Sequence, residues 1–569
     1  MKNLLLLLFT CALSAGTMAQ VTTYSFENGQ KKAEGNLAQG IEQGPWKFWD
    51  RDGNLIQEVT YLDGDFHGAY KGYYLSGKIK EEGNFDMSHK HGRFKTYFEN
   101  GNILSEGFYH LGFKDSLWTF YYEEGGKYES GFYAKDARDS IWTSWYQNGS
   151  LKSLVSCNPS EESKIIEFRD SKGSVLLKDG NGRFEDYYSD GKLKEKGAYK
   201  DGLKDGTWVQ WNNEGIKINE GNYGMGKKTG LWVVYFANGK PLSSGNYTDN
   251  KKEGPWLYYY ENGQTSKSVT YHNDLEKGEY SEWFRTGELS TKGNYNDGKK
   301  SGHWVWFLKS GLKDFEGDFV SDARNGEWKF YFHDEDKVEF EGGFKNGKKD
   351  GKWTYWYRDG VVWKMGSYAD GVKTGIWTYY AENGVKVMQG KFEGGKEEGE
   401  WQSWYDDESR KSAGSFSGGL MDGRWEGWFE TGAVNFLGAY KNGMKDGEWR
   451  HNYPSGAQEL TENYKDGILN GQRIYWFENG NKKEEGNYTD GMKNGEWIFY
   501  YENGKNQLTC TFINDRQEGK VTSWHEVGTL ESVKYFKNGR PDGTWEFYGK
   551  QEGDLLKTMK FKKGVKITE

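Results

Sequence analysis

The chain has 569 residues, of which 80 are glycine and 17% are aromatic, whereas only 6 are proline. Disordered chains are poor in aromatic residues, so this composition excludes a largely disordered protein and favours many short strands joined by tight turns. The formal net charge of −9 comes from 76 basic and 85 acidic residues mixed along the chain, a balance that disfavours nucleic-acid binding. A mean hydropathy of −0.96 excludes a membrane domain in the mature chain.

The first 19 residues predict a secretory signal peptide. Met1 and Lys2 precede the apolar run LLLLLFTCALSAG, and the small residues Thr17 and Ala19 occupy the usual cleavage positions. We therefore expect cleavage after Ala19, a mature chain from Gln20, and a secreted, periplasmic or cell-envelope location. An uncleaved N-terminal membrane anchor is the alternative interpretation.

A 24-residue repeat fills most of the remaining chain. Steps of 24 residues from Trp353 lead to Trp377, Trp401 and Trp425, and the same spacing recurs in both directions. Each unit reads G-x-[YF]-x-x-G-x-x-x-G-x-W-x-x-[YW]-x-x-x-G, with a second aromatic residue three positions after the tryptophan. About 21 such units predict a repeat architecture in which every unit is stabilised by its neighbours.

Asp-Gly and Asn-Gly pairs, such as Asp490-Gly491 and Asn503-Gly504, separate the aromatic segments within each unit. These dipeptides accept positive φ at both central positions of a tight hairpin turn, and the segments between them are rich in the residues that strands favour. Each unit is therefore predicted to be two strands and two turns. The expected fold is all-β: an elongated, single-layer antiparallel β-hairpin repeat ribbon.

Alternation along a strand divides the aromatic residues between the two faces of the ribbon. Trp497, Phe499 and Tyr501 are expected on one face, and Ile498 and Tyr500 on the other. In a single layer, columns of equivalent residues are the only core available, so we interpret the aromatic residues as structural. A ladder that stacks on a ligand is the alternative.

The repeat divides the chain into four segments after the signal peptide. Residues 20–149 hold five units and residues 182–553 hold sixteen. Residues 150–181 lose the pattern, and we interpret them as a decayed unit with an extra loop, with a hinge as the alternative. Residues 554–569 are predicted to form a capping strand whose lysines protect the exposed edge.

Several positions depart from the repeat. Arg473 and Val521 replace the tryptophan, and Asn452 replaces the second aromatic residue; we interpret all three as drift or capping. Two cysteines follow the signal peptide, Cys157 and Cys510, and on a linear ribbon they lie too far apart to pair. Both are expected to be free or to pair between chains, and Cys510 to be buried.

The pattern GxWxxYxxNG…GxYxDGxxxG resembles the MORN repeat in its bacterial variant form, also described as the YwqK-like antitoxin family. The resemblance extends from about Gly35 to Gly553. It implies hairpins in elongated, grooved sheets and a scaffold that binds proteins or membrane lipids. An antitoxin role does not suit an exported chain, because such a chain would not meet a cytoplasmic toxin.

One group of histidines is a candidate metal site. His67 and His91 are 24 residues apart and occupy equivalent turn positions, and His89 lies two residues from His91. Together with a carboxylate they could bind zinc or a similar ion, whereas a solvated turn is the simpler interpretation. No Ser/His/Asp set recurs and no glycine turn opens a helix, so no catalytic residue and no cofactor are predicted.

The second aromatic column supplies candidate binding-surface residues: Trp49, Tyr73, Tyr97, Tyr235, Tyr259, Trp356, Trp404, Trp428 and Tyr500. The function expected from these features is an exported, non-enzymatic scaffold whose long surface binds a protein at the cell envelope through many weak contacts. Binding of a glycan or the cell wall through the aromatic columns is one alternative. Membrane-surface association is another, but it is disfavoured by the net negative charge.

Overall fold

The computed structural model describes residues 20–551 and 553–568 as strands, turns and bends. The predicted signal peptide, residues 1–19, lies outside the described residues. Within the described part of the chain, no helix is long and apolar enough to span a membrane.

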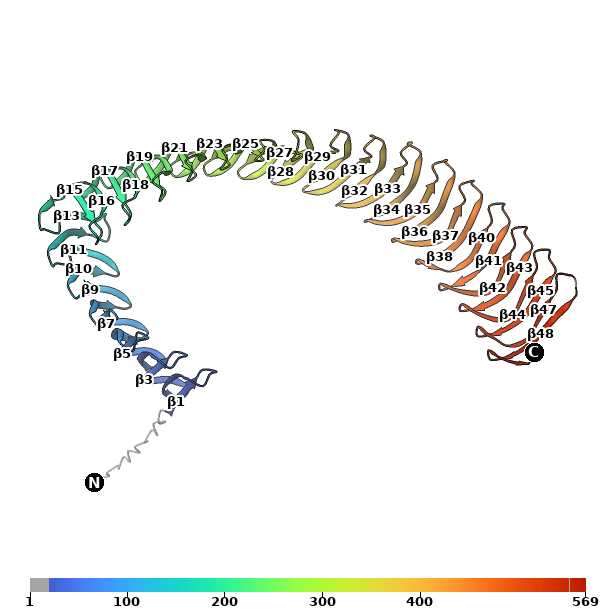
Figure 1. The fold of residues 1–569 in the computed structure, drawn as a ribbon, viewed down its shortest axis with the longest axis horizontal. Coiled ribbons are helices and arrows are strands. Elements are labelled where there is room, and N and C mark those ends of the chain that lie inside the picture. The colour runs from blue at the N-terminus through green and yellow to red at the C-terminus, as the bar shows by residue number, and fades with distance from the viewer. Residues whose placement is uncertain (1–19, 552, 569) are drawn as a thin grey trace, which may run out of the picture. The chain divides into compact units, whose positions relative to one another are not determined.

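The fold is a single antiparallel β-sheet of 49 strands, which confirms the predicted all-β repeat ribbon. The chain divides into two compact units, one ending at Leu275 and the other beginning at Glu276, and each is described here by itself. Within each unit, successive strands lie side by side in chain order (Figure 1), and most contacts join a strand to its neighbours in the sheet.

The first unit contains β1 Gln20–Ser25, β2 Lys31–Ala38, β3 Ile41–Trp49, β4 Leu55–Leu62, β5 Asp65–Tyr73, β6 Ile79–Asp86, β7 His89–Tyr97, β8 Ile103–His110, β9 Phe113–Tyr121, β10 Lys127–Ala134, β11 Ala137–Trp145, β12 Leu151–Cys157, β13 Lys164–Arg169, β14 Val175–Lys178, β15 Asn181–Tyr187, β16 Leu193–Lys200, β17 Leu203–Trp211, β18 Lys217–Gly224, β19 Lys227–Tyr235, β20 Pro241–Thr248, β21 Lys251–Tyr259 and β22 Thr265–His272.

The second unit contains β23 Leu275–Trp283, which starts at the boundary, β24 Leu289–Asn296, β25 Lys299–Phe307, β26 Lys313–Val320, β27 Ala323–Tyr331, β28 Val338–Lys345, β29 Lys348–Trp356, β30 Val362–Ala369, β31 Val372–Tyr380, β32 Lys386–Glu393, β33 Lys396–Trp404, β34 Arg410–Ser417, β35 Leu420–Trp428, β36 Val434–Lys441, β37 Met444–Asn452, β38 Gln458–Lys465, β39 Ile468–Leu469, β40 Gly471–Trp476, β41 Lys482–Thr489, β42 Met492–Tyr500, β43 Asn506–Ile513, β44 Arg516–Trp524, β45 Leu530–Lys537, β46 Arg540–Pro541, β47 Gly543–Tyr548, β48 Leu555–Lys562 and β49 Val565–Thr568.

The turn between β41 and β42 has the two-residue form that the sequence predicts. Asp490 and Gly491 have φ values of 49° and 81°, as the type I′ turn requires at both central positions. The amide of Gly491 also donates to the carbonyl oxygen of Leu469, 2.8 Å away in the preceding repeat. The Asp-Gly turn therefore closes its own hairpin and ties it to its neighbour.

The turn between β42 and β43 differs from the prediction. Gly504 has φ of 82°, but Asn503 is not among the residues with positive φ, and the Gly504 amide donates to the Tyr501 carbonyl oxygen at 2.9 Å. This geometry is a three-residue loop that ends in a glycine bulge, so the prediction of two positive φ values is wrong for Asn503-Gly504, whereas it is confirmed for Asn442-Gly443.

The asparagine of this loop is selected by hydrogen bonds. Asn503 accepts from the Lys505 amide at 3.0 Å and donates to the Glu526 carbonyl oxygen of the next repeat at 3.0 Å. Tyr501 donates across the same boundary, to the carbonyl oxygen of Trp524 at 2.8 Å. The Tyr501-Glu502-Asn503-Gly504 sequence is thus a connection between adjacent repeats as well as a turn.

The sheet continues through residues 150–181. Strands β12, β13, β14 and β15 pair in chain order, and residues 158–163 form a loop between β12 and β13. A local core of Ile165, Phe168 and Leu177 packs against Phe184 and Trp208 where the regular aromatic columns are missing. At the C-terminus, residues 554–568 form the two strands β48 and β49 in place of the single capping strand predicted.

Candidate functional site

One face of the ribbon is organised around tryptophans that lie on glycines of the preceding strand. A Cβ atom added to Gly486 would lie 2.2 Å from Cδ2 of Trp497, so the indole ring covers the bare backbone at this position. The Trp497 Nε1 donates to the carbonyl oxygen of Asn487 at 3.3 Å, which fixes the ring over the strand. Trp497 is fully buried as a result.

This arrangement repeats along the chain. An indole Nε1 donates to the backbone carbonyl ten residues earlier at Trp46, Trp118, Trp142, Trp208, Trp232, Trp256, Trp304, Trp328, Trp353, Trp377, Trp401, Trp425, Trp449, Trp497 and Trp545. Eleven residues before the ring, every one of these repeats except the last has glycine, because a side chain there would occupy the space of the ring; Lys534 stands at this position before Trp545.

A cation covers the outer side of most of these tryptophans. The Nζ of Lys493 lies 4.1 Å from the centre of the Trp497 ring, and the equivalent lysines Lys349 and Lys204 lie 3.8 Å from the rings of their own repeats. An ammonium over an indole face is attracted by the negative charge on the ring face. These repeats thus stack backbone, indole and cation, and we call the set of these cations the lysine column.

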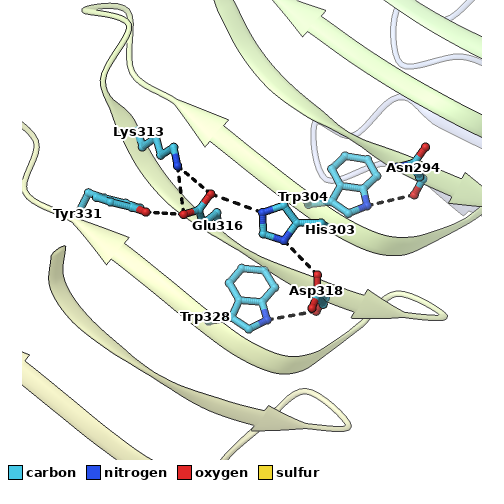
Figure 2. Close-up of polar contacts among 8 residues, drawn as sticks. All are labelled: Asn294, His303, Trp304, Lys313, Glu316, Asp318, Trp328 and Tyr331. Atoms are coloured by element: carbon cyan, nitrogen blue, oxygen red, sulfur yellow. Dashed lines mark hydrogen bonds and ion pairs between the residues drawn. The ribbon is translucent and has the colours of Figure 1, made fainter. Parts of the chain in front are cut away.

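The opposite face carries a network of tyrosine, glutamate and lysine. Glu316 accepts hydrogen bonds from Tyr331 and from Lys313, and His303 places its Nε2 3.4 Å from the same carboxylate (Figure 2). The His303 Nδ1 lies 3.0 Å from Asp318. These residues come from neighbouring strands, so the network joins one repeat to the next.

The same hydroxyl-to-glutamate bond recurs fifteen residues apart, in Tyr73 to Glu58, Tyr97 to Glu82, Tyr121 to Glu106, Tyr235 to Glu220 and Tyr500 to Glu485. Burial, followed by this bond, raises the pKa of Tyr73, Tyr97, Tyr121 and Tyr235 to about 12, so each phenol remains a donor at neutral pH. Lys217 and then Tyr235 hold the pKa of Glu220 below its ordinary value of 4.5.

These lowered carboxylate pKa values predict acid sensitivity. A group whose folded pKa is below its unfolded value of 4.5 adds stability above that pH, and the stability is lost as the pH falls through the folded pKa. We expect the urea midpoint of the wild type to fall between about pH 5 and pH 3, and the Glu220→Gln variant to lose less over that range. Parallel curves for the two proteins would contradict this assignment.

The structure places the nine candidate binding-surface residues in one column of half-buried side chains. Their polar atoms and ring faces are already engaged in several repeats: Tyr259 lies 3.3 Å from the Ser244 hydroxyl, and Lys31, Lys386 and Arg410 cover Trp49, Trp404 and Trp428. Trp356 lies in the same column. Their role in ligand binding stays a prediction.

The three candidate metal ligands have separate neighbours. The Nδ1 of His67 lies 3.2 Å from Asp86, that of His89 lies 2.8 Å from the Met87 carbonyl oxygen, and His91 packs against His110. Among the described residues, no group of three or more His, Cys, Asp or Glu is arranged to hold a metal ion. Zinc binding by these histidines stays a prediction.

In the irregular repeats with Arg473 and Val521, the tryptophan and the glycine beneath it are both replaced, and the second replacement was not predicted. Where Arg473 stands in place of the tryptophan, Glu462 stands in place of the glycine eleven residues earlier, and the Arg473 Nε lies 3.0 Å from Glu462. Val521 is matched in the same way by Cys510, and both pack in one cluster with Trp497. The constant spacing of eleven residues between the glycine position and the tryptophan position is the signal that could have revealed these paired exchanges.

Both described cysteines are free and buried, whereas burial was expected only of Cys510. Burial raises the pKa of the Cys510 thiol to about 11, which keeps it protonated and unreactive. Cys510 therefore acts as a small packing residue in the glycine position.

The turn edge of the second unit carries a row of exposed apolar side chains. Leu420, Met444, Ile468 and Met492 occupy the same position in four successive repeats, directly after the Asp-Gly, Asn-Gly or Gly-Gly turn, and are 37–52% exposed. Each of the first three lies beside the turn glycine of the next repeat. We call these four residues the turn-edge row.

The hairpin geometry defines a class, the β-hairpin repeat scaffolds. The family model for the MORN repeat variant matches nine stretches of the chain, residues 42–63, 66–87, 90–110, 181–201, 228–249, 252–273, 349–370, 469–490 and 493–514, so the chain carries this repeat at nine positions. No curated protein matches the chain.

Solved structures match the chain at low sequence identity. The crystal structure of TcdB2-TccC3-Cdc42 is 11% identical over 93% of this chain and 30% of that chain, with a TM-score of 0.12. A mutant form of the Photorhabdus luminescens Tc holotoxin pore is 12% identical over 93% and 30% of the two chains, with a TM-score of 0.13. The chain thus spans less than a third of these proteins, and such low scores bear on neither fold nor function.

Proposed function

We propose that the chain is an exported, non-enzymatic MORN-repeat scaffold that binds a partner protein at the cell envelope. The observation that carries the proposal is the turn-edge row, where four successive repeats expose an apolar side chain at one position. Contiguous exposed apolar side chains mark interaction sites, and single scattered ones do not. The partner is a protein with an extended apolar segment, long enough to contact several repeats together.

Avidity, the combined effect of many weak contacts, is expected to supply the affinity for the partner. Each repeat offers one exposed apolar side chain, whose contact adds little by itself, but contacts from neighbouring repeats act together once the first has formed. The aromatic columns are less accessible to a partner, because their hydroxyls and ring faces already bind glutamate and lysine side chains. For this reason we place the partner on the turn edge and prefer a protein to a glycan.

A site-specific crosslinking experiment in the organism that encodes the chain tests the proposal. A photo-crosslinking amino acid is placed at Met444, and Lys348 at the same repeat position is the matched control. We expect one discrete protein adduct from position 444 and none from 348, on a processed chain that starts at Gln20 and fractionates with the envelope.

Two outcomes would refute the proposal. Identical adducts from both positions would remove the turn-edge row as the interaction surface. An unprocessed chain found in the cytoplasm would remove the exported location.

A further inference from the structure

The lysine column of the second unit is interrupted at two successive repeats. The Nζ of Lys373 lies 4.4 Å from the ring centre of Trp377, and the Nζ of Lys445 lies 4.2 Å from the ring centre of Trp449. Between them the column holds Glu397 and Met421. The two tryptophans of these repeats therefore lack the lysine ammonium that covers their neighbours.

A second column shrinks at the same place. The side chain two residues after the tryptophan is aromatic in Tyr355 and Tyr379, but becomes Ser403 and then Gly427. Phe436 lies against the bare backbone of Gly427 and fills that position, since a Cβ there would lie 2.2 Å from its ring. The strand partners of Ser403 are Met388 and Ser412, neither of which is aromatic.

The combined losses leave a cavity of about 620 Å³ over β32 to β35. Its lining includes the rings of Trp401, Trp425, Phe392 and Phe416, together with the Glu397 side chain. Trp401 and Trp425 are 6% and 8% exposed, whereas Trp353, Trp377 and Trp497 are 0% exposed. The cavity thus opens onto two rings that are more exposed than those of Trp353, Trp377 and Trp497.

We propose that this cavity binds a trimethylammonium group supplied by a ligand. The ammonium would take the place that lysine holds in the neighbouring repeats, over the indole face, with Glu397 supplying the opposite charge. Among the described residues, Glu397 forms no ion pair. The pKa of Tyr379 is raised first by the burial of its phenol and second by the negative charge of Glu397. The site does not depend on the proposed scaffold role.

The polar groups favour a quaternary ammonium over a primary one. A primary ammonium carries three N–H donors that need acceptors once water is removed. The Ser403 and Ser412 hydroxyls lie 2.6 Å apart, so one donates to the other, and the Glu397 carboxylate is the charged acceptor among the lining residues. A trimethylammonium group has no donors, so aromatic faces and one carboxylate are sufficient.

The nearby lysine does not prevent binding. Lys373 lines one end of the cavity, with its Nζ 4.6 Å from the Phe392 ring centre. A cation over Trp401 would follow Lys373 by one repeat, as Lys373 itself follows Lys349. The fold therefore already tolerates cations at this spacing.

Calorimetric titration of the full chain with choline tests the site, with 3,3-dimethyl-1-butanol as the neutral analogue of the same shape. We expect choline to bind at least about tenfold more tightly than the alcohol, since each cation–π contact contributes up to about 2 kcal/mol when desolvated. Equal affinity for the two compounds would overturn the proposal, because the cavity would then be a simple apolar hollow.

Two variants locate the binding. Glu397→Lys restores the residue found in the flanking repeats, so it should fold and fill the site with its own ammonium, and choline binding should be lost. Glu430→Lys makes the same charge change at an exposed turn and should leave choline binding unchanged. Loss of choline binding in both variants, or in neither, would contradict the site. If Glu397→Lys fails to fold, the Glu397→Gln variant decides, because it is expected to weaken choline binding at least about threefold.

Two further measurements distinguish a lipid headgroup from a small soluble molecule as the source of the trimethylammonium group. Retention of the chain on phosphatidylcholine vesicles, lost in Glu397→Lys, would place the trimethylammonium group on a lipid headgroup. Binding of choline without vesicle retention would place it on a small soluble molecule.

Discussion

Replacing Gly486 with alanine is expected to destabilise the pairing of β41 with β42 by about 3 kcal/mol. The new Cβ would lie 2.2 Å from the Trp497 ring, and the ring cannot move away without losing its hydrogen bond to Asn487 and its buried position. Because a chain of repeats does not unfold as one cooperative unit, the effect is best measured by native-state hydrogen exchange of the amides in these two strands.

The control and the rescue both come from the chain itself. Gly224→Ala places a Cβ at an ordinary 3.6 Å from Thr229, so it should change exchange little. The next repeat already pairs Cys510 with Val521, and therefore Trp497→Val should reduce the cost of Gly486→Ala. If the alanine costs as much opposite valine as opposite tryptophan, the steric explanation is wrong.

Removing the charge of Arg473 is expected to be similarly harmful, at about 2–3 kcal/mol. The guanidinium contacts both Glu462 and Glu484, and all three side chains are largely buried, so Arg473→Ala leaves two carboxylates without their cation. The loss should appear as faster hydrogen exchange in β38, β40 and β41, while distant repeats stay unchanged.

The complementary variant restores the regular pair at this position. Glu462→Gly together with Arg473→Trp should be at least as stable as the wild type, since a packed apolar pair often equals or exceeds a buried ion pair. Each single change should be destabilising, because tryptophan would clash with Glu462 and glycine would leave Arg473 partly unpaired. Additive effects of the two changes would show that the positions are not coupled.

Local chemistry explains why much of the fold could be predicted. Asp490-Gly491 adopts its turn because few other pairs accept two positive φ values, and alternation assigns Trp497 and Tyr500 to opposite faces whatever their partners are. The Asn503-Gly504 loop was predicted less well. Its side-chain hydrogen bond reaches the following repeat, and a dipeptide carries no information about that partner.

The candidate sites also combine features set by residues close together in the chain with features set by residues far apart in it. A binding role of the second aromatic column stays a prediction, and the glutamates that accept from the hydroxyls of Tyr235 and Tyr500 lie fifteen residues earlier and were not anticipated. The cavity beside Glu397 was not anticipated either. It exists because two columns are interrupted in the same repeats, and only strand pairing places those columns side by side.

By itself the sequence determined the repeat period, the strand and turn order, and the face of each aromatic residue, because each of these depends on residues close together in the chain. The tertiary structure decided which glycine lies beneath which tryptophan, why Glu462 accompanies Arg473, and where the packing leaves a cavity. These features join residues eleven or more positions apart, and they become neighbours only when the register of the paired strands is established.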